Sequence, residues 1–123
     1  MRAQHATECE LLVMKAIWAN PELELSMPAI MDIVNKTYDK EWAPQTVSTF
    51  LKRLRKRGFL EAERRGRSFV YHSLIRLEDY KANTVMDCCD FWCDGDVVKM
   101  LEIVKEDRGF SSEECDKIKQ LLQ

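Results

Sequence analysis

Residues 44–57 carry the pattern that most narrows the folds open to this chain. Apolar side chains recur there at intervals of three and four residues, at Val47, Phe50, Leu51 and Leu54. This spacing predicts an amphipathic helix with one face in a hydrophobic core. Pro44 suits its first turn, and Gly58 is the residue expected just beyond its end. The opposite face carries short polar side chains first and then cations, so it is free to meet a partner.

The segments around this helix predict the rest of the fold. Thr7 and Glu10 have the spacing of a capping box at the start of a first helix, and Ser26 is a suitable cap for a second. After residue 58, the segments 59–64 and 67–74 alternate apolar and polar residues around Arg65-Gly66, with Phe69 and Tyr71 expected on the inner face. Three helices followed by a hairpin with a basic tip indicate a winged helix-turn-helix. The predicted fold class is mainly α with a small β-hairpin.

Charge is divided unevenly along the 123 residues. Residues 1–75 hold 12 Lys/Arg and 9 Asp/Glu, a net charge of +3, whereas residues 76–123 hold 7 and 12, a net charge of −5. Within residues 44–67 the net charge is +6, because eight cations face only Glu61 and Glu63. Such clustering is typical of a protein that binds a polyanion, although a solvated basic helix face would look the same.

The order of side chains favours DNA over that simpler interpretation. A helix seated in the major groove reads base edges with short hydrogen-bonding side chains, while cations contact the flanking phosphates. The predicted base-reading residues are Gln45, Thr46, Ser48 and Thr49. The predicted phosphate contacts, on the helix and on the hairpin or wing, are Lys52, Arg53, Arg64, Arg65 and Arg67. The alternative is a winged helix that binds an acidic protein, but such a surface would be expected to expose apolar anchors.

Four short motifs between Leu12 and Leu74 resemble the BlaI/MecI/CopY family of bacterial transcriptional repressors. They are Val13-Met14-x-x-Ile17-Trp18, Trp42-Ala43-Pro44-Gln45-Thr46-Val47, Leu51-x-x-Leu54-x-x-x-Gly58-Phe59-Leu60 and Phe69-x-Tyr71-x-Ser73-Leu74. The resemblance implies a homodimer that binds a near-palindromic operator and represses resistance or metal-homeostasis genes. It also implies base reading by Gln45, Thr46 and Ser48. Members that respond to β-lactams tend to have lysine in place of Gln45 and arginine in place of Ser48, so the preferred operator need not be shared.

Residues 76–123 are predicted to form a second, acidic, helical module beside the DNA-binding domain at residues 1–75. A helix is expected from Leu77 to Phe91, and Ser111 with Glu114 has capping-box spacing for the last helix. A module of this size buries its helices poorly alone, so pairing with a second copy is expected, as in the family; packing back on the first domain is the alternative. The predicted dimer interface is Val97, Val98, Leu101, Val104, Ile118, Leu121 and Leu122.

The family resemblance also suggests a second partner for this module, an antirepressor protease. In the antibiotic-response branch, an antirepressor protease relieves repression by a cut in this module, commonly at an Asn-Phe bond. The matching pair here is Glu102-Ile103. The resemblance therefore does not extend to this protease signal.

Catalytic, cofactor and export signals are absent from the sequence. There are two histidines, no glycine-rich phosphate loop and no nucleophile elbow, which argues against an enzyme. The N-terminus lacks an export signal and the cysteine count is odd, so we expect a soluble, cytoplasmic protein with reduced thiols. No cofactor or metal is predicted, and Cys88, Cys89 and Cys93 are expected to pack in a core. A metal- or thiol-responsive repressor that uses these three cysteines remains an alternative.

Overall fold

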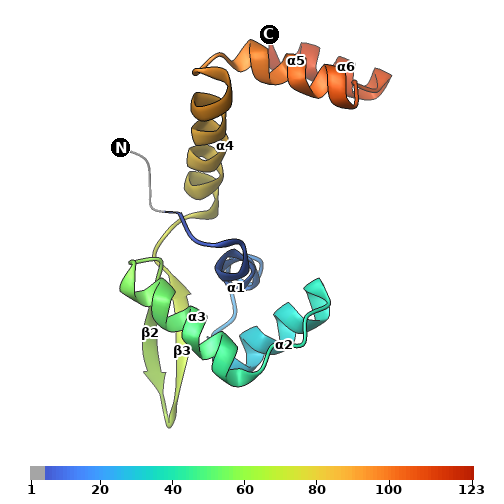
Figure 1. Cartoon of the computed structure of the whole chain (residues 1–123). Coiled ribbons are helices and arrows are strands. Elements are labelled where there is room, and N and C mark those ends of the chain that lie inside the picture. The colour runs from blue at the N-terminus through green and yellow to red at the C-terminus, as the bar shows by residue number, and fades with distance from the viewer. Residues whose placement is uncertain (1–4) are drawn as a thin grey trace. The chain divides into compact units, whose positions relative to one another are not determined.

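The computed structural model describes residues 5–123 and is mostly helical, with one small antiparallel sheet (Figure 1). Its elements in chain order are α1 Glu8–Trp18, β1 Leu25–Ser26, α2 Met27–Tyr38, α3 Pro44–Lys56, β2 Leu60–Arg65, β3 Ser68–Ser73, α4 Leu77–Cys93, α5 Val97–Asp107 and α6 Ser112–Leu121. Internal contacts divide the chain into two units, Met1–Lys81 and Ala82–Gln123. The division falls inside α4. The predicted boundary between a DNA-binding domain at residues 1–75 and a dimerisation module at residues 76–123 stays a prediction.

The first unit is a three-helix core flanked by the sheet. Its fully buried apolar side chains come from all three helices and from the segment after α3: Val13, Met14, Ile30, Val34, Val47, Leu51, Leu54, Phe59 and Leu60. The predicted capping box of α1 is present, with the Glu10 N–H donating to Thr7 Oγ1 and the Thr7 N–H donating to Glu10 Oε1. Ser26 caps α2. The apolar stripe of α3 is therefore buried in a core that α1 and α2 complete.

The sheet has three strands in the order β1-β3-β2. The sequence analysis did not assign β1 to the sheet; in the structure Leu25 pairs with Tyr71 and Ser26 with Val70 of β3. The expectation that Phe69 and Tyr71 face inward holds for Tyr71, which packs against the core, but Phe69, on the same face, is 45% exposed. Val70, on the opposite face, is buried. Val70 pairs with the N-cap of α2, and α2 contacts β3. Phe69 lies beyond the end of β1, toward the hairpin tip.

The segment that leaves β3 and begins α4 is anchored by hydrogen bonds to the first unit. Trp18 Nε1 donates to the Ile75 carbonyl at 2.9 Å and to Ser73 Oγ at 3.0 Å. Tyr80, in the first turns of α4, is buried, and its hydroxyl accepts a hydrogen bond from the Ala6 N–H. The start of α4 thus belongs to the first unit.

The second unit contains the rest of α4, α5 and α6. The predicted capping box at Ser111 and Glu114 is present, and Arg108 also pairs with Glu114 at 3.1 Å. The Arg108 hydrogen bond, together with the Ser111 N–H, lowers the pKa of Glu114 to about 2. Within the described part of the chain, α5 and α6 contain no buried residue. In residues 5–123, no helix combines the length and the apolar character needed to cross a bilayer.

Candidate nucleic-acid interface

A short connection fixes where α3 begins. The Asn35 side chain bonds both backbone groups of Trp42, accepting from its N–H at 3.0 Å and donating to its carbonyl at 3.1 Å. The indole of Trp42 then packs on Phe50, with ring centroids 5.0 Å apart. Asp39, which ends α2, takes the left-handed conformation needed for the turn, with φ 54°. α3 is therefore anchored at its first turn and along its apolar stripe.

The outward face of α3 bears the predicted base-reading residues. Gln45 is exposed, while Thr46, Ser48 and Thr49 are half-buried. The Thr49 hydroxyl donates to the Gln45 carbonyl at 2.9 Å, so its proton is already used inside the helix. Ala43 precedes α3, and in residues 5–123 no side chain caps this N-terminus. The positive end of the helix dipole is therefore open at the same end as these residues.

The cations of α3 do not all face outward. Lys52, Arg53, Arg55 and Lys56 are exposed. Arg57, the last of the run, is 29% exposed and forms an ion pair with Glu10, which is 1% exposed. Arg57 also donates to the His5 carbonyl. The sequence analysis missed this pair, although Glu10 lies three, four and seven residues before Val13, Met14 and Ile17 and so shares their buried face.

This ion pair changes the ionisation of Glu10. Burial raises the pKa of the carboxyl group, but the Thr7 N–H, Arg57 and the Thr7 hydroxyl lower it by more. The net pKa lies below its ordinary value, so Glu10 is charged and joins the start of α1 to the end of α3. Arg57 serves the fold and is not one of the outward cations.

The wing arginines differ in how much they are held. Arg64 lies over the Phe69 ring, 6.0 Å from its centroid, and donates to the Gly66 carbonyl at 3.0 Å. Arg67 is exposed in the turn between β2 and β3. Arg65 binds Glu24 through Nη2 at 2.6 Å and Glu63 through Nη1 at 2.7 Å. Its hydrogen bond is the main reason that the pKa of Glu63 is lowered. In this structure Arg65 is therefore directed to the sheet, although the sequence predicts a phosphate contact.

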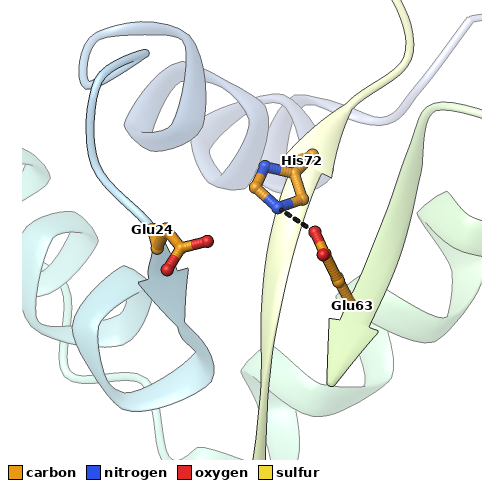
Figure 2. A group of neighbouring side chains, drawn as sticks. All are labelled: Glu24, Glu63 and His72. Atoms are coloured by element: carbon orange, nitrogen blue, oxygen red, sulfur yellow. Dashed lines mark hydrogen bonds and ion pairs between the residues drawn. The ribbon is translucent and has the colours of Figure 1, made fainter. Parts of the chain in front are cut away.

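Glu24, just before β1, lies close to Glu63 of β2 and His72 of β3 (Figure 2). His72 Nε2 is 3.1 Å from Glu63 Oε2. One ligand atom each from Glu24, Glu63 and His72 lies within 4.8 Å of the others. Nothing in the sequence pattern singled out Glu24, because it enters the group through the pairing of β1.

The residues predicted for a dimer interface are mostly exposed in the single chain. Their exposed fractions include 51% for Val97, 61% for Val98, 41% for Leu101 and 36% for Val104, and about 80% for Leu121 and Leu122. Ile118 is half-buried. An apolar groove of about 390 Å³ lies in the same unit, lined by Cys88, Trp92, Cys93, Met100, Ile103 and Val104.

The three cysteines of α4 have different environments. Cys89 and Cys93 are buried, as expected for packing, whereas Cys88 is exposed. Burial, with a smaller contribution from Cys93, raises the pKa of the Cys89 thiol, which disfavours its thiolate. Among residues 5–123, the group of side chains spaced closely enough to hold a metal ion contains no cysteine.

Comparison with known proteins gives concordant matches along the chain. Residues 6–123 match the sequence model of the family described as Penicillinase repressor. The penicillinase repressor of Bacillus licheniformis is 30% identical over 117 residues, covering 95% of this chain and 88% of that protein. The methicillin resistance regulatory protein MecI of Staphylococcus aureus (strain N315) is 26% identical over 83 residues, covering 68% of each chain.

Solved structures match the winged helix. The monomeric form of Bacillus licheniformis BlaI, solved in complex with the blaP half-operator, aligns with a TM-score of 0.52 and 34% identity, covering 64% of this chain and 92% of that one. The DNA-binding domain of the repressor BlaI aligns with a TM-score of 0.51 and 36% identity, covering 62% of this chain and 88% of that one. The predicted winged-helix fold and the predicted family are confirmed: the chain belongs to the penicillinase repressor family.

Proposed function

We propose that this chain is a DNA-binding transcriptional repressor that occupies a near-palindromic operator as a homodimer. Family membership supports the repressor class, since the family and its Bacillus licheniformis member are named as penicillinase repressors and BlaI was solved on a half-operator. The relatives belong to a family of regulators and not of enzymes. The operator sequence, the base-reading residues and the dimer are the parts of the proposal that are specific to this chain.

The outward face of α3 is the observation that carries the proposal. Its first turns present amide and hydroxyl groups at the uncapped end of the helix, which suits base edges and a nearby phosphate. We assign base reading to Gln45, Thr46 and Ser48, with Thr49 as an acceptor because its proton is engaged. Phosphate contacts are assigned to Lys52, Arg53, Arg64 and Arg67, and to Arg65 once it leaves Glu24 and Glu63.

Pairing of two chains is supported by the unburied apolar faces of the second unit. Contiguous exposed apolar surface is uncommon on a monomer and marks an interface. The stripe on α5 formed by Val97, Val98, Leu101 and Val104 is exposed along its whole length. A second copy, related by a two-fold axis, would bury both stripes at once and would match the symmetry of a palindromic operator.

The interaction-module alternative is not favoured. A protein-binding face is expected to have a central apolar or aromatic anchor, whereas the outward face of α3 offers amide, hydroxyl and cationic groups. A repressor that senses thiols or metal through Cys88, Cys89 and Cys93 would keep the same DNA contacts and differ only in its inducer.

Selection of bound sequences from a random DNA pool with the purified full chain tests the proposal. We expect enrichment of two inverted half-sites whose centres lie about one helical turn, or a multiple of it, apart. The half-site sequence should differ from one read by lysine and arginine at positions 45 and 48. Enrichment of a single unpaired half-site would contradict dimeric binding, and no enrichment over the starting pool would contradict sequence-specific repression.

A further inference from the structure

We propose that Glu24, Glu63 and His72 form a binding site for a zinc-class divalent cation, and that its occupation releases Arg65 from the sheet toward DNA phosphate. The first part concerns the protein alone. The second part rests on the proposed function, since it assigns a regulatory role to the wing.

Strand pairing brings the three ligands together. The register that joins Leu25 to Tyr71 places Glu24 opposite His72, so their side chains lie on the same face of the sheet. In the other pair, Glu61 lies opposite His72, and Glu63 follows two residues later on that face. One ligand atom from each of Glu24, Glu63 and His72 already lies within 4.8 Å of the other two (Figure 2).

The donor set fits zinc better than the hard cations. Imidazole nitrogen suits zinc and its neighbours, whereas calcium and magnesium prefer an all-oxygen shell. Zinc binds nitrogen and carboxylate oxygen at about 2.0–2.2 Å, and a site with three protein ligands keeps its fourth position for water. Glu24 and Glu63 are exposed, so their side chains have room to close the remaining distance once Arg65 releases them.

Arg65 shows that this place already attracts a cation. Its guanidinium donates to both carboxylates, through Nε and Nη2 to Glu24 and through Nη1 to Glu63. A dication and this guanidinium compete for the same oxygens. The pairs that Arg65 would give up are exposed, and exposed pairs contribute little stability, so a zinc ion is able to displace it.

Displacement changes the charge of the wing in the direction that favours DNA. With Arg65 in place, two carboxylates face one guanidinium; with zinc, the same carboxylates face a dication and Arg65 is free. Arg65 ends β2 next to Gly66, and Arg64 and Arg67 flank this tip. Zinc therefore acts as a co-repressor that adds one phosphate contact for each wing.

Direct binding is the first test, carried out on the tag-free full chain under a non-thiol reductant. Competition with a chromophoric chelator should show one zinc per chain. Glu63→Gln and His72→Gln should each weaken that binding by at least about tenfold, with circular dichroism confirming the fold. Glu22→Gln is the matched control, because it removes the same charge two residues from Glu24. A bound cobalt ion should give a spectrum without thiolate-to-cobalt charge transfer, which separates this site from the cysteines.

Arg65→Ala distinguishes a zinc site from a cluster of Glu24, Glu63 and His72 that only stabilises the sheet. Removing the competing guanidinium should tighten zinc binding by about threefold to tenfold. No stoichiometric zinc, binding that survives His72→Gln, or weaker binding in Arg65→Ala would each overturn the site.

Affinity for duplex DNA across a salt series tests the coupling. Zinc should raise the affinity of the unmodified chain for operator and scrambled duplexes alike and steepen the salt dependence, because a phosphate contact is added. Arg65→Ala should lose this steepening. If zinc binds but the DNA affinity is unchanged or lower, the release of Arg65 is wrong. Failure of every DNA to bind would contradict the proposed function, while the zinc titration without DNA would still decide the site.

Discussion

Glu10 and Arg57 join two helices whose relative position decides what DNA would meet. Glu10 accepts from the Thr7 N–H at the start of α1, and its other oxygen pairs with Arg57 at the end of α3. Both functions need the charged carboxylate, and Glu10 is fully buried. A buried charge without its partner is costly, so this pair restricts α3 to one arrangement against α1.

Glu10→Gln should therefore lower the free energy of unfolding by about 2 kcal/mol, because a charge-assisted pair is lost and Arg57 is left partly buried without its counter-ion. Urea unfolding followed by circular dichroism measures the change. Glu8→Gln, an exposed position in the same turn, should cost less than about 1 kcal/mol. Equal effects of the two substitutions would show that the pair adds nothing beyond the helix terminus.

The same pair predicts a pH dependence. The folded-state pKa of Glu10 lies below the ordinary value of 4.5, so the unfolded state takes up the proton first as the pH falls. The stabilisation by Glu10 is complete above that value and decreases as the pH falls below it. Urea unfolding between about pH 6 and pH 3 should show a steeper loss for the unmodified chain than for Glu10→Gln. Parallel curves would mean that Glu10 does not titrate differently in the two states.

Base and phosphate contacts should separate in their effects on binding. Thr46→Ala should reduce the preference for operator over scrambled duplex by about 1–3 kcal/mol, because one base-edge contact is lost. Arg67→Ala should weaken binding to both duplexes by similar factors and flatten the salt dependence. Thr37→Ala, an exposed threonine of α2, is the control. If Thr46→Ala weakens both duplexes equally, α3 does not read a base at that position.

Single residues were predictable from sequence only where a local pattern defines them. The capping residues Thr7 and Ser111 follow from capping-box spacing and Ser26 from its residue type, and all three are observed. The partners of Arg57 and Arg65 were not predictable, because Glu10 is 47 residues away from the former and Glu24 is 41 residues away from the latter. Long-range pairing of charges depends on the packing of elements, which a local pattern does not specify.

The connection between α2 and α3 sets the direction of the proposed recognition helix. The Asn35 side chain makes hydrogen bonds to both the backbone N–H and the backbone carbonyl of Trp42. Asn35→Ala leaves both groups without this partner and should lower the free energy of unfolding by about 1–2 kcal/mol. It should also weaken binding to operator and scrambled duplexes together, because the start of α3 moves. Thr37→Ala serves again as the control, and unchanged DNA affinity in a destabilised Asn35→Ala chain would show that α3 is positioned by its apolar stripe alone.

Elements long enough to show a periodic pattern of apolar residues were predictable from the sequence, and the shortest element was not. The stripe from Val47 to Leu54 predicted α3, and the alternation around Gly66 predicted the hairpin. β1 has two residues, too few to show a period, and it exists because it pairs with β3. Phe69 shares the face of Tyr71, but it lies beyond the end of β1 and is exposed, which strand alternation alone could not show.

At the scale of the whole molecule, the chain combines a unit that has a well-buried core with a second unit in which, among the described residues, only Cys89 and Cys93 are buried. The sequence predicted this asymmetry from the size of the second module. It could not specify where one unit ends, because α4 is continuous through the division and its first turns pack with Trp18 and Phe59 through Tyr80. Pairing of two chains is the step that would complete the second unit.

Leu101→Asp tests that step, because a carboxylate in the middle of a paired apolar stripe would be buried without a partner. We expect the unmodified chain to sediment as a dimer at micromolar concentration and the variant as a monomer. Lys99→Asp places a carboxylate on the opposite side of the same helix and should leave the dimer intact.

The affinity for DNA should change with the oligomeric state. Leu101→Asp should bind a full operator much more weakly than the unmodified chain. Its affinity for a half-site should stay the same, because each winged helix keeps its own contacts. A monomeric unmodified chain, or a Leu101→Asp dimer, would show that the stripe on α5 is not the dimer interface. Equal losses on full and half-sites would instead show that the second unit supports the fold of the first rather than its pairing.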